Sequence, residues 1–125
     1  MIETVVTDRG PKAIGPYSQA VRANGFLFLS GQIALSPKTQ QVIDGGASQQ
    51  TERVIENLKG ILEAAGSSLQ QVVKTTVFLA NMSDFGAMNE VYGRYFAENP
   101  PARSTIEASR LPRNVLVEIE LVALV

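Results

Sequence analysis

The sequence predicts a single α+β domain in which one β-sheet is covered on one face by two helices. Short segments with the composition of strands lie near both ends of the chain. Between them, two segments carry apolar residues at three- and four-residue spacing, the pattern of amphipathic helices. The length of 125 residues fits one domain, residues 1–125, and is too short for two ordinary ones.

The first part of the chain predicts three strands and an irregular loop. Residues 2–7 alternate loosely between apolar and polar, which suits a short strand. Two Gly-Pro pairs then break regular structure between residues 10 and 17. The turn signal Asn24-Gly25 predicts a hairpin between residues 21–24 and a strand that starts at Phe26. Because residues 26–29 are all apolar, we expect this strand to be buried on both faces.

The first predicted helix spans residues 47–65 and follows a turn-rich segment at residues 36–46. Gly66 stands where a C-terminal cap belongs. The apolar face of this helix consists of Val54, Ile55, Leu58, Ile61, Leu62 and Ala65.

The second predicted helix begins with Ser83 or Asp84 as its N-cap, and Pro100-Pro101 stops it. Its apolar stripe consists of Met88, Val91, Tyr92, Tyr95 and Phe96.

Three further strands complete the prediction. Residues 72–80, between the two helices, are rich in β-branched side chains. Residues 103–109 and 114–125 close the chain. The predicted order is therefore three strands, a helix, a strand, a helix and two strands.

The composition excludes several kinds of chemistry. The chain contains no Cys and no His, which removes thiolate nucleophiles, disulfides, imidazole bases and the usual zinc sites. A net charge of -1 provides no overall field that would attract nucleic acid. No signal-peptide pattern and no apolar run of about 20 residues are present, so we expect a soluble cytoplasmic protein.

The last strand contains the first pair of candidate site residues. Glu118 and Glu120 lie two positions apart in an apolar run and therefore share one face of the strand. They face either solvent or a pocket with a cationic or hydrogen-bonding partner. In a pocket, burial would raise the pKa of such a carboxyl group, which is a useful property in a general base.

Arg103 is the second candidate, because it follows two prolines at the rigid start of a strand. It shares a face with Thr105 and Glu107, and its guanidinium can bind a carboxylate through two parallel hydrogen bonds. The alternative is an ordinary surface arginine that pairs with Glu107 or Glu120.

Four further residues carry weaker signals. Ser30 and Gly31 end the apolar strand, where a glycine either lets a ligand approach the backbone or simply forms a turn. Tyr17 lies in the Gly-Pro loop as a binding hydroxyl or a packed aromatic ring. Asn89 is a mediocre helix former inside a helix, which indicates a specific hydrogen bond.

Five segments of the chain occur in an order that matches a known pattern. They are AIGPYSQA (13–20), LSGQ (29–32), VKTTVFL (73–79), PARS (101–104) and LPRNVLVEIE (111–120). Together they resemble the signatures of the RidA (reactive intermediate deaminase A, YjgF-type) family, and the resemblance covers essentially the whole chain.

The resemblance implies a chorismate-mutase-like fold with a mixed sheet and two helices on one face. It also implies a homotrimer in which the sheets form a central barrel and three clefts lie between subunits. The implied activity is hydrolysis of 2-imino acids, such as 2-iminopropanoate and 2-iminobutanoate, to 2-oxo acids and ammonia. The resemblance implies no cofactor, and the composition, net charge and hydropathy described above lead us to expect no metal and no nucleic-acid or membrane partner.

By the same resemblance, Arg103 binds the substrate carboxylate and Glu118 activates the attacking water. Thr105 stands where relatives often have Cys and where backbone groups contact the ligand. The other cleft residues implied are Tyr17, Ser30, Gly31 and Asn89.

Two other functions remain open from the sequence. The first is a non-catalytic regulatory protein that binds small carboxylates in the same clefts, for which Arg103 alone would suffice. The second is ribonuclease activity, which has been attributed to some relatives of this kind. The net charge of -1 and the absence of His argue against a ribonuclease.

Overall fold

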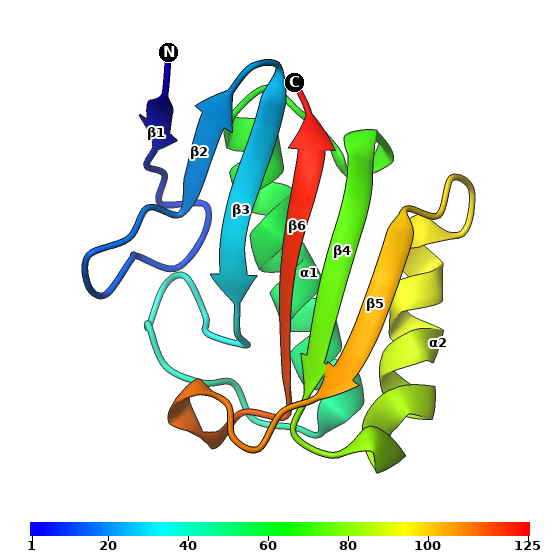
Figure 1. Cartoon of the computed structure of the whole chain (residues 1–125). Helices are drawn as coiled ribbons and strands as arrows, with labels where there is room; N and C mark the ends of the chain where they lie inside the picture. Colours follow the sequence, from blue (N-terminus) through cyan, green and yellow to red (C-terminus); the bar gives the residue numbers. More distant parts are fainter.

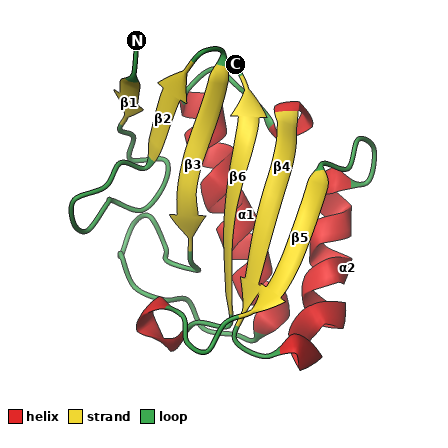
Figure 2. Cartoon of the chain, in the orientation of Figure 1, coloured by secondary structure: helices red, strands yellow, loops and turns green.

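A computed structural model describes all 125 residues as two layers, a six-stranded sheet and a pair of helices behind it (Figures 1 and 2). The order of the strands in the sheet is β1-β2-β3-β6-β4-β5. This architecture confirms the predicted α+β class and the predicted order of elements. The elements are β1 Glu3–Val5, β2 Ala20–Ala23, β3 Phe26–Gln32, α1 Ala47–Ala64, β4 Val72–Leu79, α2 Phe85–Phe96, β5 Ala102–Glu107 and β6 Val117–Leu124.

The sheet is mixed because one of its five strand pairs is parallel. β4 and β5 run parallel, and the chain between them forms α2, whereas all other neighbouring strands are antiparallel. The last strand, β6, lies between β3 and β4 and joins the N-terminal strands to the β4-α2-β5 unit. β1 and β5 are the edge strands of the sheet.

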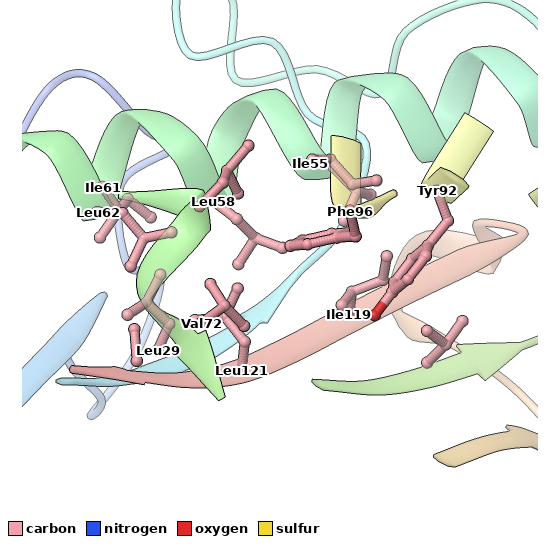
Figure 3. Packing of buried hydrophobic residues seen from close by; sticks show 14 of the residues in the cluster. Leu29, Ile55, Leu58, Ile61, Leu62, Val72, Tyr92, Phe96, Ile119 and Leu121 are labelled. Atoms are coloured by element: carbon pink, nitrogen blue, oxygen red, sulfur yellow. The ribbon is translucent and has the colours of Figure 1, made fainter. Parts of the chain in front are cut away.

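The hydrophobic core lies between the helices and one face of the sheet (Figure 3). Alternate side chains of β6, namely Val117, Ile119 and Leu121, point toward the helices and are 0–2% exposed. Full burial of one such side chain stabilises the fold by about 1.5–3 kcal/mol, so this face fixes the helices on the sheet. The predicted apolar face of α1 is confirmed, since all six of its residues are 0–6% exposed.

The ends of the helices agree with the sequence in part. α1 ends at Ala64, and Gly66 adopts the positive φ of +87° that a C-terminal cap needs. Asp84 precedes α2, but its side chain makes no capping hydrogen bond. Instead, Asn81 Oδ1 accepts a hydrogen bond from the Ser83 N–H and caps a short 3₁₀ turn before the helix. Neither helix combines the length and the apolar character that a membrane-spanning segment requires.

The expectation that the Phe26 strand is buried on both faces is wrong for this chain. In β3, Leu27 and Leu29 are 0% and 5% exposed, whereas Phe26 and Phe28 are 38% and 46% exposed. The reason is that both helices cover the same face of the sheet, so the opposite face has no second layer within the chain.

Four strands are shorter than predicted. β4 ends at Leu79 rather than at residue 80, and β5 ends at Glu107 rather than at residue 109. β1 covers only Glu3–Val5 of residues 2–7. β6 begins at Val117 rather than at residue 114, because residues 112–114 form a 3₁₀ turn. In this turn Arg113 and Asn114 have φ values of 57° and 55°, in the left-handed region that a strand does not use.

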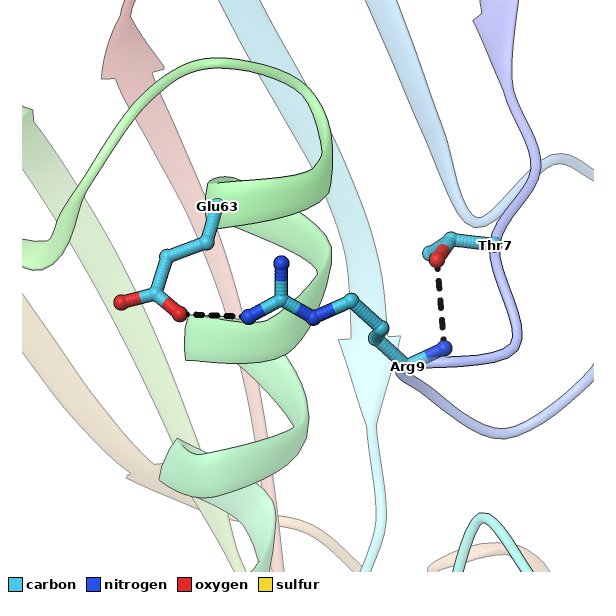
Figure 4. A network of polar contacts seen from close by, with 3 residues as sticks. All are labelled: Thr7, Arg9 and Glu63. Atoms are coloured by element: carbon cyan, nitrogen blue, oxygen red, sulfur yellow. Dashed lines mark hydrogen bonds and ion pairs between the residues drawn. The ribbon is translucent and has the colours of Figure 1, made fainter.

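The loop between β1 and β2 is held against α1 near its C-terminal end. A Cβ at Gly60 would overlap the carbonyl oxygen of Arg9, and a Cβ at Gly10 would lie 2.7 Å from Ile61 Cγ1. Arg9 also pairs with Glu63 at 2.6 Å, and its N–H donates to Thr7 Oγ1 (Figure 4). An exposed ion pair contributes little, so the close backbone contact at the two glycines fixes this loop.

Candidate active site

A pocket of about 550 Å³ opens beside β3 and β6, where the chain's loops border the sheet. Four of the predicted site residues line it: Tyr17, Ser30, Gly31 and Glu118. Glu120 lines it as well, so both glutamates of β6 border the pocket, Glu118 half-buried and Glu120 exposed. We refer to Tyr17, Ser30, Gly31 and Glu118 as the Glu118 half-site.

Glu118 lies in this pocket with a raised pKa. Its side chain lies on the sheet face away from the helices and is half-buried. Burial raises the pKa of the Glu118 carboxyl above its ordinary value of 4.5, and the neighbouring Glu120 raises it further. A carboxylate with a raised pKa is a stronger base for removing a proton from water.

Gly31 provides the space that Glu118 occupies. The pairing of β3 with β6 is interrupted between Leu29 and Gln32, and Ser30 and Gly31 lie in this irregularity. A Cβ on Gly31 would overlap Oε2 of Glu118, so the carboxylate lies directly on the glycine backbone. The sequence marked Gly31 as a point of close approach, and the group that approaches is a carboxylate of the same chain.

The loop that carries Tyr17 is fixed by hydrogen bonds to β3 and to its own neighbours. Ser30 Oγ donates to the Ser18 carbonyl at 2.6 Å, and the Ser30 N–H donates to the Gln19 carbonyl at 3.0 Å. The Tyr17 hydroxyl accepts a hydrogen bond from the Ile14 N–H at 3.2 Å. Tyr17 is therefore positioned at the edge of the pocket with half of its surface exposed.

Gln19 is a positioning residue that the sequence reasoning missed. Its side chain is 3% exposed, and Oε1 accepts from the Thr7 N–H at 2.8 Å. Its Nε2 donates to the carbonyls of Thr7 and Pro11 at 2.9 and 2.7 Å. A single amide thus holds the segment that forms one wall of the pocket. No spacing rule marks such a residue, because its partners are backbone groups of an irregular loop.

Arg103 lies at the start of β5, on the side of the sheet that α2 covers. Its Nη1 donates to Asn89 Oδ1 at 2.8 Å. The specific hydrogen bond predicted for Asn89 within the helix is therefore made to Arg103. The guanidinium lies over the ring of Tyr92 at 4.7 Å and that of Phe85 at 5.5 Å. Arg103 forms no ion pair with Glu107 or Glu120, so the surface-pair alternative is wrong.

Thr105 follows Arg103 on the same face of β5. Its Oγ1 is buried without a hydrogen-bond partner, an arrangement that is uncommon in folded proteins. Glu107 is the next residue on this face, and its carboxylate accepts the Met82 N–H at 2.7 Å. We refer to Asn89, Arg103 and Thr105 as the Arg103 half-site.

One chain does not bring the two half-sites together. Arg103 pairs with Thr75 of β4, whose buried hydroxyl is hydrogen-bonded to Tyr92 of α2 at 2.7 Å. Glu118 pairs with Phe78 of β4, three positions along and hence on the opposite face. The helices cover one face only, so Arg103 and Glu118 lie on different sides of the sheet. Glu120 pairs with Thr76 of β4 and lies on the same side of the sheet as Glu118, away from Arg103.

The sheet face away from the helices is notably apolar. Phe26 and Phe28 of β3, Ile106 of β5 and Leu124 of β6 each expose 38–47% of their surface. The rings of the two phenylalanines are 6.3 Å apart. We refer to these four residues as the apolar sheet face.

The pocket offers few ligands for a metal ion. Its acidic residues are Glu118 and Glu120, and the chain contains no His or Cys. No group of three or more His, Cys, Asp or Glu side chains is placed to hold an ion. The chemistry that this donor set supports is proton transfer and hydrogen bonding by carboxylate, hydroxyl and guanidinium groups.

Comparisons with known proteins agree on one family. Residues 7–125 match the family model described as Endoribonuclease L-PSP. A RutC family protein of Pyrococcus horikoshii is 54% identical over 123 residues, which is 98% of each chain. The mouse protein named 2-iminobutanoate/2-iminopropanoate deaminase is 45% identical over 97% of this chain and 90% of its own. The crystal structure of RidA from the Antarctic bacterium Psychrobacter has a TM-score of 0.94 at 41% identity, covering 98% of this chain and 99% of that one.

Proposed function

Because this chain belongs to the Endoribonuclease L-PSP (YjgF/RidA) family, we propose that it hydrolyses 2-imino acids to 2-oxo acids and ammonia. The substrates are short 2-imino acids such as 2-iminopropanoate and 2-iminobutanoate, the compounds in the name of the mouse relative. The observation that carries the proposal is Glu118, a half-buried carboxyl with a raised pKa that lies on Gly31 in a pocket.

The reaction needs a base more than it needs an activating metal. The imine carbon is already electrophilic, particularly when its nitrogen is protonated. Glu118 removes a proton from water, the oxygen forms a bond to the imine carbon, and the C=N electron pair moves to nitrogen. Proton transfer to that nitrogen lets the C–N bond break while the new hydroxyl loses its proton and becomes the carbonyl, so the products are ammonia and the 2-oxo acid. General-base assistance of this kind contributes about 10²–10⁴-fold to the rate.

In this proposal Arg103 binds the substrate carboxylate and orients the imine carbon. Its guanidinium keeps a fixed plane because it stacks on Tyr92 and donates to Asn89, leaving other N–H groups for a ligand. The unpartnered Oγ1 of Thr105 is a further donor beside it. Correct orientation of this type lowers the barrier without any covalent step.

The position of the half-sites supports an active site between subunits. Since Arg103 and Glu118 lie on opposite faces of one sheet, a complete site takes Arg103 from one copy and Glu118 from another. We propose a homotrimer in which the apolar sheet faces of three copies pack against each other. The exposed phenylalanines of β3 and the open edge of β5 provide the surfaces for this contact.

A coupled assay tests the activity. Threonine dehydratase releases the precursor of 2-iminobutanoate, and 2-oxobutanoate is followed at early times with and without this protein. We expect the wild-type chain to accelerate formation of the 2-oxo acid, and Arg103→Ala and Glu118→Gln to lose the acceleration. Arg94→Ala is the matched control, since Arg94 is an exposed arginine of α2 that pairs only with Glu90.

The result of Glu118→Gln separates the proposal from the carboxylate-binding alternative. An enzyme loses turnover in this variant but still binds 2-oxobutanoate through Arg103. A regulatory protein would bind the 2-oxo acid equally well with either residue and would never accelerate the reaction. RNA cleavage that survived repurification and was lost in Glu118→Gln would instead favour the activity in the family's description.

A further inference from the structure

Two cationic side chains of the pocket have no role in the reaction proposed above. Lys12 and Arg113 both line the pocket that contains Glu118 and Glu120. The three ion pairs of the chain are Arg9–Glu63, Arg22–Glu3 and Arg94–Glu90, so neither of these cations has an ion-pair partner.

Gln40 is hydrogen-bonded to both residues that carry these cations. Its side-chain Oε1 accepts the Lys12 N–H at 3.1 Å, and its main-chain carbonyl accepts from Arg113 Nη1 at 3.1 Å. Gln40 and Arg113 both have left-handed φ values, 60° and 57°. A non-glycine residue in this region is uncommon, and such conformations cluster at ligand-binding positions. Three segments distant in the sequence are thus tied together where the two cations meet the pocket.

The pocket keeps its opposite charges apart. No nitrogen of Lys12 or Arg113 lies within 4.0 Å of a carboxylate oxygen of Glu118 or Glu120. A volume of about 550 Å³ leaves room for a ligand between the two groups. A suitable ligand would present an anionic group to the cations and its reacting carbon to Glu118.

We propose that Lys12 and Arg113 bind a carboxylate on the side chain of the substrate, which makes 2-imino dicarboxylic acids a favoured substrate class. This inference rests on the proposed function, in which Arg103 of another copy binds the carboxylate next to the imine carbon. A substrate with one carboxylate leaves Lys12 and Arg113 unused. A substrate with a second carboxylate satisfies both cations.

The test compares two substrates in the same protein. An L-amino acid oxidase generates the imine of alanine, and an L-aspartate oxidase generates the imine of aspartate. Hydrolysis is measured by competition with semicarbazide, which traps the imine. We expect Lys12→Gln and Arg113→Gln each to lower the ratio of kcat/KM for the dicarboxylic imine to that for the monocarboxylic imine by about tenfold, the effect of one charge-assisted hydrogen bond.

Arg110→Gln is the matched control, because Arg110 is an exposed arginine close to Arg113 in sequence and does not line the pocket. We expect it to leave the ratio within about twofold, a difference too small for a lost charge-assisted bond. The side chain of Lys12 makes no hydrogen bond or ion pair, and only its backbone N–H is bonded. Lys12→Gln should therefore fold normally, so a changed ratio in this variant reports the lost charge rather than misfolding.

Two outcomes would overturn the inference, because each leaves the ratio unchanged: kcat/KM that stays at the wild-type value for both imines in both variants, or an equal loss of kcat/KM with both imines. The second outcome would mean that the two cations bind the carboxylate common to all substrates. If wild-type protein hydrolyses neither imine, the proposed function fails, but the cation pair is still tested by calorimetry. Binding of 2-oxoglutarate that is tighter than that of 2-oxobutanoate, with the difference lost in Lys12→Gln, would support the pair independently of turnover.

Discussion

Gly31 links the backbone of β3 to the reactivity of Glu118. A Cβ at this position overlaps Oε2 of Glu118, so Gly31→Ala must displace the carboxylate from its place in the pocket. A displacement of about 1 Å at a reacting group can lower the rate about 10²-fold, and we expect a loss of that size in kcat/KM. Steady-state kinetics of imine hydrolysis measures it.

Gly93→Ala is the control for this prediction. A Cβ at Gly93 in α2 meets nothing within 4 Å, so full activity is expected. Wild-type activity in Gly31→Ala would show that the contact with Glu118 does not place the catalytic base.

Glu120 affects the pH at which the enzyme works. Catalysis requires the ionised form of Glu118, so kcat/KM declines as the pH falls through the raised pKa of this group. Glu120→Gln removes the like charge but leaves the burial, which is the larger cause of the raised pKa. We therefore expect the acid side of the pH profile to move to lower pH in Glu120→Gln. Steady-state measurement of kcat/KM across the acid pH range gives the shift.

The same profile for Glu52→Gln gives the reference, because Glu52 is an exposed residue of α1 outside the pocket. A profile that stayed in place or moved to higher pH in Glu120→Gln would exclude an electrostatic effect of Glu120 on the base.

At the scale of elements, α1 supports the pocket from behind through a buried polar residue. Asn57 is 0% exposed, and its Nδ2 donates to the carbonyls of Leu35 and Ile33 at 2.9 and 3.3 Å. Asn57→Ala leaves these buried carbonyls without that donor, and we expect it to lower the free energy of unfolding by about 1–3 kcal/mol. Urea denaturation measures the change, with Glu52→Ala as an exposed control on the same helix.

Because Ile33 and Leu35 line the pocket, imine hydrolysis should weaken in Asn57→Ala as well. A free energy of unfolding equal to that of the control would mean that the loop before α1 holds its shape without this amide.

The elements differ in how well their sequence predicts them, and the differences have physical causes. α1 packs one face on the sheet, so the 3.6-residue period of its apolar residues predicts both its limits and its buried side. In β3 the apolar pattern predicted burial on both sides, yet Phe28 is exposed in the chain. Hydrophobicity indicates that a surface prefers to avoid water, but it does not indicate which element covers it.

Local sequence patterns predicted some of the residues that line the pocket, but not how the candidate residues are arranged. Alternation along the last strand placed Glu118 and Glu120 on one face, and both line the pocket. The relation of Arg103 to Glu118 depends on the register of two strands with β4, which no local pattern encodes. Gln19 and Gln40 act on backbone groups of loops, where side-chain periodicity carries no information.

At the scale of the whole molecule, mixing two inactive variants tests whether the site lies between chains. Arg103→Ala and Glu118→Gln each lack one half-site, and a trimer that contains both can combine an intact Arg103 with an intact Glu118. Random assembly of equal amounts restores about one quarter of the sites, because each intact half is present with a chance of about one half. Denaturing, mixing and refolding the two variants should therefore return about a quarter of wild-type activity, by the same arithmetic.

Each variant refolded alone is the control and should stay inactive. Mixed protein with no activity, despite a light-scattering mass of three chains, would place both halves of the site in one chain and contradict the proposed assembly.

The placement of Arg103 and Glu118 on opposite sides of a sheet also concerns the newly made protein. On the proposed arrangement, a single folded chain carries one Glu118 half-site and one Arg103 half-site but no complete site. A chain that has folded but not assembled is therefore inactive. Specific activity should then fall on dilution into the range where subunits separate, and it should recover on concentration. A cell that makes only a few copies would therefore hydrolyse little imine. Doubling a low concentration of the protein would more than double the rate of hydrolysis.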